Sequence, residues 1–270
     1  MKEFFYEILT RPLFNLLIFL YSIVGDLGVA IIVFTLIVKL ILYPLTKKQI
    51  KAQEEMKKIQ PKLAKLKEKY KDDKEKLMLK QTELYKKEGV NPASGCLPLL
   101  VQMPIFIAIF WMLRPGPDNV FSINQEHLMV SKEALYNFPS LKNIEEVNKN
   151  FLNLIDLTKK STLIALIAAG LQFLYSKIMS AKNKNQKKAK EKNQKKKGEP
   201  EIQDIMAQQM QNMTYIFPAL TFIIGLSLPA GLPLYWASST FFSIIQHKID
   251  SKKKKSNPNK NEINKKGRQR

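Results

Sequence analysis

Lys39 is the residue whose position most directly suggests chemistry, because it lies inside a long apolar run at residues 27–46. At ~1.5 Å per helical residue, it sits on the order of 10 Å inside the nearer end of that run. An ammonium at membrane depth costs roughly 2.5–3.5 kcal/mol unless water or a partner stabilises it. The other apolar runs offer no acidic partner, so we expect hydration; the alternative is a side chain that snorkels to the headgroups.

Other polar residues inside the apolar runs recur at helical spacing. Thr35, Lys39 and Tyr43 are spaced by four residues, so they share a helix face. Tyr235 and Ser239 are also four residues apart, and Gln246 follows seven residues later on the same face. If these faces meet, they line a hydrated groove; ordinary interhelical hydrogen bonds and interface aromatics are the alternatives. The predicted groove residues are Lys39, Thr35, Gln102, Gln172, Ser176, Tyr235, Trp236 and Ser239.

What the chain lacks argues against several classes of enzyme. A lone Cys96 forms neither an intrachain disulfide nor a metal cluster, and the two histidines lie far apart. There is no phosphate-binding Gly-rich loop, HExxH helix or Gly-x-Ser-x-Gly elbow. A hydrolytic pair of Lys39 with a serine is conceivable, but no sequence feature pairs them. We therefore expect a protein that is not an enzyme and needs no cofactor.

The apolar runs predict an all-α polytopic membrane protein, because about 20 apolar residues are needed to cross the hydrocarbon as a helix. Residues 1–24 are predicted as an interfacial amphipathic helix, with a cleaved signal peptide as the alternative. In that helix, the residues expected to face lipid are Phe4, Phe5, Ile8, Leu9 and Leu16. The core, residues 25–250, is predicted to contain five spans, at residues 27–46, 93–113, 161–180, 213–228 and 232–249.

Charge predicts the orientation of these spans in a chain of formal net charge +21. Residues 47–88 carry fifteen lysines against eight acidic residues, and the segments 181–204 and 251–270 are also strongly basic. The loop at 114–160 is balanced. With five spans, all three basic segments lie on one side, which the positive-inside rule identifies as the cytoplasm. The N-terminus is then outside and the C-terminus cytoplasmic.

Residues 47–90 are predicted to form a cytoplasmic helical hairpin. Met56, Ile59, Leu63 and Leu66 recur in steps of three and four, which is typical of a packed helix face, and a polar turn follows at 71–74. A solvated charged linker is the alternative. The polybasic loop 181–204 and the tail 251–270 show no such face and are expected to be disordered.

Several motifs resemble those of the YidC/Oxa/Albino family of membrane protein insertases. The matching stretches are residues 38–46 (VKLILYPLT), 91–92 (NP), 95–106 (GCLPLLVQMPIF), 177–180 (KIMS) and 228–236 (LPAGLPLYW). The resemblance covers roughly residues 25–250 and implies a five-span core around a hydrophilic groove that is open to cytoplasm and lipid. Lys39 stands where the family usually has arginine, which keeps the charge but not the planar guanidinium. Many Gram-negative members carry a large external domain, which we do not expect in the modest loop at 119–158.

This resemblance implies an insertase and chaperone of the bacterial inner membrane that takes nascent membrane proteins as clients. Hydrophilic parts of the client enter the groove, Lys39 attracts acidic ones, and the apolar segment slides into lipid. The implied partners are the ribosome, bound through the basic tail, and also the Sec translocon and signal-recognition-particle targeting factors. Anionic lipids are the rival partner of the same tail. A solute or ion transporter is the second class of function, and a passive scaffold is the third.

Overall fold

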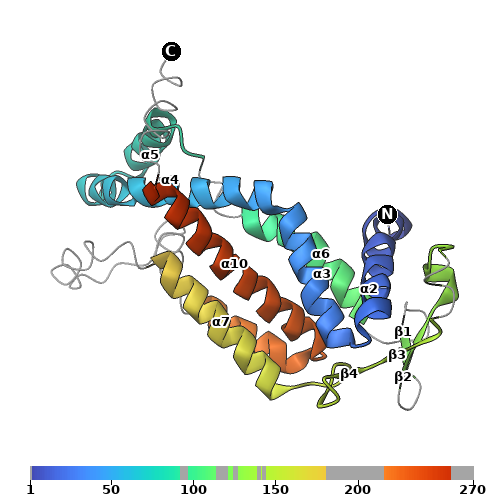
Figure 1. Ribbon diagram of the computed structural model, residues 1–270. Helices are drawn as coiled ribbons and strands as arrows, with labels where there is room; N and C mark the ends of the chain where they lie inside the picture. Colours follow the sequence, from blue (N-terminus) through green and yellow to red (C-terminus); the bar gives the residue numbers. More distant parts are fainter. Residues whose placement is uncertain are drawn as a thin grey trace.

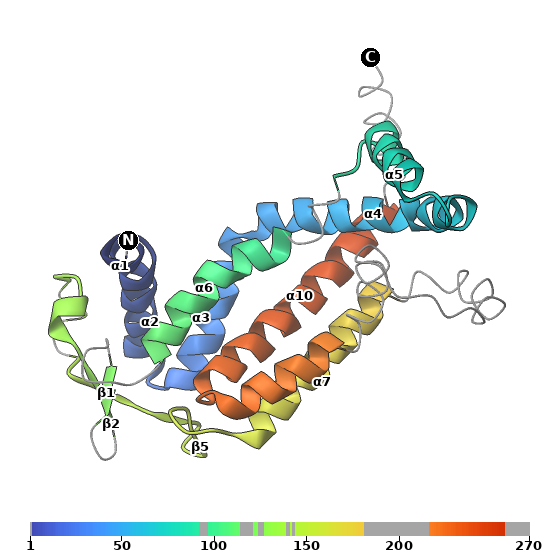
Figure 2. The same cartoon turned by 180° about the vertical axis from the view of Figure 1, so that it is seen from behind.

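The computed structural model describes residues 2–91, 97–113, 121–123, 127–138, 141, 144–180 and 216–256. The protein is mostly helical, which confirms the coarse fold class predicted from the sequence (Figure 1). Four long helices lie side by side as a bundle. A pair of helices projects from one end of it, called here the hairpin end, and short strands lie at the opposite end, called here the strand end (Figures 1 and 2).

Helix α3 (Leu27–Ile41) is the first helix of the bundle. Asp26 caps it by accepting a hydrogen bond from the Val29 amide at 2.9 Å. The helix ends at Ile41, not at residue 46 as predicted, and α4 (Tyr43–Lys69) leaves at an angle of 69°. Pro44 explains the break, because its ring disfavours helical geometry in the preceding residue and it lacks an amide hydrogen. Only two residues of α3 follow Lys39. Lys39 therefore lies roughly 3 Å, measured along the helix axis, from the end of α3, and not on the order of 10 Å as predicted.

Helices α4 and α5 (Lys74–Glu88) form the projecting pair and are joined by a turn at Tyr70–Asp73. Asp73 begins α5 by accepting a hydrogen bond from the Lys76 amide at 3.0 Å, and Gly89 ends it with a φ of 62°. A small apolar cluster holds the two helices together. It consists of Met56, Ile59, Leu63, Tyr85 and Val90.

Helices α6 (Leu97–Leu113), α7 (Thr162–Ser180) and α10 (Gly231–Ser256) complete the bundle, with a shorter helix at Ile216–Ser227 beside α7 and α10. Helix α10 is central, because it packs against α7, α3 and α6 (Figure 2). Its side chains therefore meet groups from three other helices, as the side chains of an interhelical site would.

The strand end was not anticipated as β structure in the sequence. Strands β1 (Phe121–Ile123), β2 (His127–Val130) and β3 (Glu146–Asn148) form an antiparallel sheet in the order β1-β2-β3. Strands β4 (Asn150–Phe151) and β5 (Ile155–Asp156) form a separate small hairpin. These strands are only two to four residues long, too short for alternation of apolar and polar residues to be recognised in advance.

The N-terminal segment is helical through α1 (Lys2–Phe5), the π-helical turn η1 (Tyr6–Thr10) and α2 (Arg11–Val24). The part from Glu3 to Val24 is long and apolar enough to cross a membrane, although the sequence analysis assigned it to the interface. It packs mainly against α3 and α6 of the bundle and also contacts the strand end.

Three contacts spread along the segment show this. The ring of Phe5, expected to face lipid, meets that of Trp111 near the end of α6. Further on, Asn15 donates to the Ala134 carbonyl at 2.9 Å, and the Tyr21 hydroxyl accepts from the Asn148 amide at 3.0 Å.

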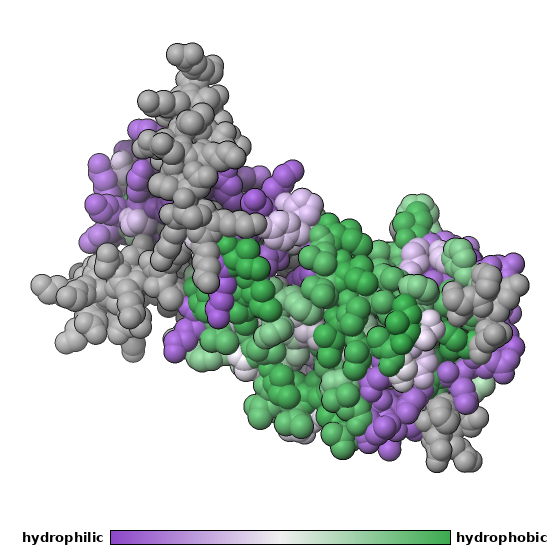
Figure 3. Space-filling view, viewed as in Figure 1, coloured by the Kyte–Doolittle hydropathy of each residue, from purple (hydrophilic) through white to green (hydrophobic). Residues whose placement is uncertain are grey.

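Large apolar side chains cover the outside of the bundle, whereas hydrophilic residues cover α4, α5 and much of the strand end (Figure 3). On α7 the exposed apolar residues are Leu163, Leu166, Ile167, Phe173 and Leu174. A water-soluble protein rarely exposes such a continuous apolar surface, so this belt is the face that contacts lipid.

Among the described parts of the five predicted spans, the helix Thr162–Met179 is long and apolar enough to cross a membrane. The apolar helices Leu100–Leu113 and Ile216–Ser227 are shorter, and α3 is followed by the bend. Helix α10 is long enough, but a series of polar residues lowers its hydropathy. The five-span count therefore stays a prediction. The predictions of disorder in 181–204 and in most of the tail concern residues outside the described ranges.

Candidate functional site

A row of polar side chains runs along one face of α10. Its members are spaced by four, four, three and four residues, which keeps them on one side of a helix. We call them the polar row: Tyr235, Ser239, Ser243, Gln246 and Asp250. Tyr235 is near the strand end and Asp250 near the hairpin end, so the row extends along most of the bundle.

Lys39 meets the middle of the polar row. Its Nζ atom donates to Ser243 Oγ at 3.1 Å, and Ser243 Oγ donates in turn to the Ser239 carbonyl at 2.8 Å. Within the part of the chain that the structure describes, no carboxylate pairs with Lys39. An ammonium has three donors, and Ser243 accepts from one of them. The cation is therefore held by a neutral partner and keeps hydrogen-bonding capacity for water or a ligand.

Gln102 of α6 meets the strand end of the row. Its Nε2 atom donates to the Tyr235 hydroxyl oxygen at 2.8 Å, and Tyr235 is 2% exposed. This bond satisfies two polar groups that would be costly to bury alone. It joins α6 to α10 on the same side as Lys39.

Tyr43 meets the hairpin end of the row. Its hydroxyl donates to Asp250 Oδ1 at 2.7 Å, linking the first residue of α4 to the last turns of α10. Asp250 Oδ2 and Gln246 Nε2 are buried and, within the described part of the chain, have no hydrogen-bond partner. Tyr43 and Gln246 belong to the polar stripes predicted from the sequence, although they are not among the eight predicted groove residues. Asp250 was missed, although 246 and 250 continue the spacing of 239 and 243.

The other four predicted residues form none of these contacts with the polar row. Thr35 is fully buried and donates to the Ile31 carbonyl within α3. Gln172 of α7 accepts from Thr240 at 3.2 Å, an interhelical bond on a different face of α10. Ser176, one turn after Gln172, is half-buried on α7. Trp236 lies between the rings of Phe106 and Phe217, at 5.7 and 6.4 Å.

The structure thus links Lys39 and Gln102 to the face of α10 that carries Tyr235 and Ser239, whereas Thr35 and Gln172 bond to other groups. The role of Thr35, Gln172, Ser176 and Trp236 in a groove stays a prediction. Ser243, the direct partner of Lys39, was missed. Its spacing of four from Ser239 was the available signal.

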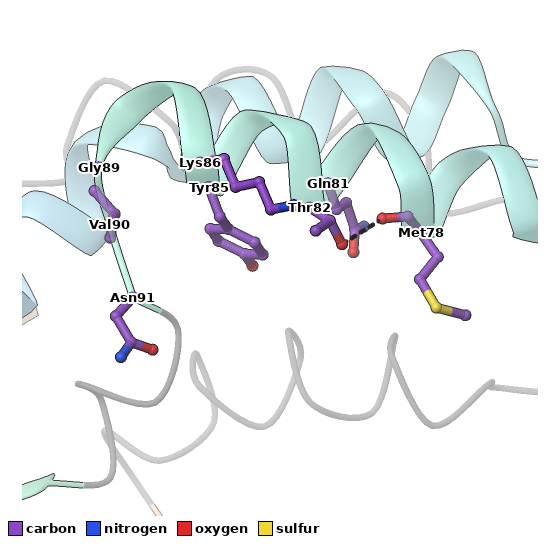
Figure 4. A pocket seen from close by; sticks show the side chains of 8 residues that line it. All are labelled: Met78, Gln81, Thr82, Tyr85, Lys86, Gly89, Val90 and Asn91. Carbon is purple, nitrogen blue, oxygen red and sulfur yellow. Dashed lines mark hydrogen bonds between the residues drawn. The ribbon is translucent and has the colours of Figure 1, made fainter.

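A hollow lies on the projecting helices, away from the polar row. It has a volume of about 620 Å³ and follows one side of α5 and the segment after it (Figure 4). Burial raises the pKa of Tyr85, whose ring lines it, and Thr82 donates to the Met78 carbonyl beside it at 2.9 Å. The lining residues are Met78, Gln81, Thr82, Tyr85, Lys86, Gly89, Val90 and Asn91.

A helical bundle with an apolar exterior and a half-buried cation on a polar interior face defines a class: a polytopic membrane protein with a polar pathway or binding surface among its helices. Comparison with known families makes this specific. The model of the family described as 60Kd inner membrane protein matches residues 19–258. The chain belongs to this family, and is accordingly a multi-pass protein of the bacterial inner membrane.

Relatives of two lengths match the chain. The membrane protein insertase YidC of Fusobacterium nucleatum is 33% identical over 93% of this chain and 98% of its own length. The membrane protein insertase YidC of Shewanella halifaxensis is 37% identical over 89% of this chain, but the match spans 36% of that longer protein. A crystal structure described as an active YidC insertase with its first transmembrane domain resolved superposes with a TM-score of 0.51. It is 26% identical, with 89% of this chain and 45% of that one covered.

Proposed function

We propose that this protein is a membrane protein insertase and chaperone, which moves segments of other proteins into the bilayer without an enzymatic reaction. The observation that carries the proposal is the contact of Lys39 with Ser243 inside an apolar bundle. Kinship with proteins named as insertases supports it. Nascent membrane proteins are then the clients.

The proposed mechanism uses the polar row as the wall of a hydrated groove that is open to the hairpin end and to lipid. Hydrophilic residues of the client enter this groove, and Lys39 attracts acidic ones. At an effective dielectric constant of ~20, an ion pair at 4 Å is worth about 4 kcal/mol before desolvation. This is comparable with the roughly 2.5–3.5 kcal/mol needed to place one charge in the membrane. One fixed cation is therefore enough to shift the balance of insertion.

The client's apolar segment leaves sideways into lipid in this mechanism. The exposed apolar belt on α7 and its neighbours supports the step, because lipid reaches the bundle surface there (Figure 3). Burial of the client's apolar surface in lipid supplies the driving force, at about 25 cal/mol per Å². No nucleotide is required.

The proposed orientation puts the hairpin end in the cytoplasm and the strand end outside. The lysine-rich helices α4 and α5 favour this arrangement. The N-terminal segment then lies at the outer side as an interfacial helix, because Asn15 and Tyr21 hydrogen-bond to the strand end and Phe5 meets Trp111 near the end of α6. Its apolar length serves to cover the bundle and the outer leaflet.

The proposed partners other than clients involve the basic segments. The tail at 251–270 binds ribosomal RNA through phosphate contacts, with anionic lipid as the rival ligand. The helices α4 and α5 receive clients from signal-recognition-particle targeting factors or from a Sec translocon. A salt titration of ribosome binding by the full chain and by a chain ending at Asp250 tests the first of these. Equal binding by the two contradicts it.

The test of the proposed function is reconstitution of the full chain in liposomes with a single-span client whose translocated tail is acidic. We expect Lys39→Ala and Lys39→Glu to lower insertion several-fold, and Lys39→Arg to retain most of it. Lys177→Ala, at an exposed lysine in the last turn of α7, is the matched control. Equal insertion by all Lys39 variants removes this residue from the mechanism, and no insertion by the unaltered protein defeats the proposal.

A further inference from the structure

Two atoms at the hairpin end of the polar row lack the partners that buried polar groups need. Asp250 is 7% exposed; its Oδ1 accepts from Tyr43, whereas Oδ2 has no partner. Gln246, one turn earlier on the same face, is 9% exposed, and its Nε2 has no partner either. An unsatisfied buried group costs roughly 1–3 kcal/mol, so native structures contain few of them. Two such atoms one turn apart indicate a place for a ligand.

The surroundings make the unpaired carboxylate unusual. The start of α4 carries Lys47, Lys48 and Lys51, and Lys248 precedes Asp250 on α10; all four are exposed. None of the lysines whose side chains the structure describes forms an ion pair with Asp250. Instead, the neutral hydroxyl of Tyr43 holds one oxygen and leaves the other available.

We propose that Asp250, with Gln246 beside it, binds the Lys or Arg residues that flank a client's transmembrane segment on its cytoplasmic side. This inference rests on the proposed insertase function. The chemistry of the two free atoms fits a basic peptide segment: Oδ2 requires a donor, which an ammonium or guanidinium supplies, and Nε2 requires an acceptor, which a main-chain carbonyl supplies. A metal ion fits less well, since no group of three or more metal-ligating side chains occurs within the described ranges.

The distance between the two charged residues sets an order of charges. Ser243, which holds Lys39, precedes Asp250 by seven residues, or roughly 10 Å along the helix axis. The polar row therefore accepts an acidic residue deeper in the bundle and a basic residue nearer the cytoplasm. The positive-inside rule places Lys and Arg on the cytoplasmic side of membrane proteins, so a site for a basic residue at this end selects the orientation of the client.

Tyr43 acts as a positioning residue for this site. It is the first residue after the bend between α3 and α4, and its hydroxyl fixes the rotation of the Asp250 carboxylate. Tyr43 and Ser251 are half-buried, so the site borders the surface at the hairpin end. A basic side chain reaches it from that side without passing Lys39.

The test compares two single-span clients that differ only in their cytoplasmic flank, Lys-Arg in one and Gln-Gln in the other. The full chain is reconstituted in liposomes, and protease protection measures correctly oriented insertion. We expect the unaltered protein to favour the basic flank about fivefold and Asp250→Asn to reduce this ratio to about one. Asp72→Asn, at an 87% exposed carboxylate in the turn before α5, is the matched control and keeps the ratio. Tyr43→Phe keeps the carboxylate and is expected to retain at least half of the preference.

Crosslinking provides the second readout. A photoreactive group placed on the client's basic flank should label the part of α10 that contains Gln246 and Asp250, and Asp250→Asn should reduce that labelling. An unchanged ratio and unchanged labelling in Asp250→Asn overturn the proposal and leave a structural water as the occupant. An equal loss of both clients in Asp250→Asn and Tyr43→Phe overturns it in favour of a structural link. Failure of the unaltered protein to insert either client defeats the proposed function itself.

Discussion

The two ends of α10 differ in how completely their polar groups are satisfied. At the strand end, Ala230 and Gly231 donate their amides to the Lys159 and Leu157 carbonyls at 2.8 and 3.0 Å. Leu232 there is fully buried. At the hairpin end, two buried atoms of the polar row have no hydrogen-bond partner among the described residues, and Lys39, at the middle of the row, has one. The contrast indicates that one end is built to be closed and the other to receive a ligand.

Closure of the strand end predicts the largest effect on stability. Gly28, in the first turn of α3, lies against the ring of Phe151 in β4. A Cβ atom at this glycine would overlap the ring. We expect Gly28→Leu to lower the free energy of unfolding by about 3 kcal/mol, because overpacking forces the strands away from the helix. Thermal unfolding in detergent measures it. Gly170→Ala is the control, since a Cβ there meets nothing within 4 Å and alanine favours the helix. Equal stability of both variants contradicts the close packing.

The bond between Gln102 and Tyr235 predicts the next largest effect. Tyr235→Phe leaves the Gln102 amide without its partner, and we expect a loss of about 2 kcal/mol in the free energy of unfolding. Gln102→Leu combined with Tyr235→Phe removes both polar groups, so the double variant should be more stable than Tyr235→Phe alone. A double-mutant cycle from denaturation in detergent measures the coupling. Additive losses would mean that the two side chains do not interact.

These two contacts also show what the sequence could and could not predict. Helical spacing placed Tyr235 and Ser239 on one face, because that depends only on the helix period. The same spacing could not show that Lys39 meets Ser243, or that Gln172 turns to Thr240 instead. Such pairing depends on the rotation and displacement of one helix against another. The proximity of Gly28 to Phe151 likewise joins residues far apart in the chain, and no local pattern records it.

The bend after α3 and the short strands were also not predicted from the sequence. Pro44 was visible in the sequence, but a proline near the end of an apolar run is compatible with either a kinked span or a new helix. The structure has the second, at 69°. Asp26 and Gly25, by contrast, are local signals of a helix start and end, and they do mark the boundary between α2 and α3.

Asp156 predicts a smaller, pH-dependent effect at the strand end. Burial alone raises its pKa, but hydrogen bonds from Thr158 and the charges of Lys149 and Lys159 outweigh burial and lower the pKa. Because its pKa is lowered in the folded state, the ionised carboxylate stabilises the fold at pH values above the unfolded pKa of about 3.9. This stabilisation is lost as the pH falls through the folded pKa. We expect Asp156→Asn to lose about 1 kcal/mol at pH 7.

The difference between Asp156→Asn and the unaltered protein should shrink as the pH is lowered below about 4. Melting temperatures measured in detergent between pH 7 and pH 3 check this. A difference that stays constant over the whole range would show that the carboxylate charge does not matter at this position.

The projecting helices predict the smallest effect. Lys62 and Glu88 form an ion pair at 2.5 Å between α4 and the end of α5, but the lysine is 56% exposed. Exposed pairs are worth about 0.2–1 kcal/mol, so Lys62→Ala should only slightly increase hydrogen exchange at the end of α5. The change should decrease further at high salt. A loss of protection throughout both helices would show that the pair, and not the apolar cluster around Ile59, holds them together.

The most direct test of the account is photocrosslinking from position 102 to an acidic-tailed client stalled during insertion. Gln102 donates to Tyr235 on the same face of α10 that holds Lys39. The account predicts crosslinks to the client's hydrophilic tail, and fewer of them in Lys39→Glu. Crosslinks only to lipid or to neighbouring helices, in both proteins, would contradict it.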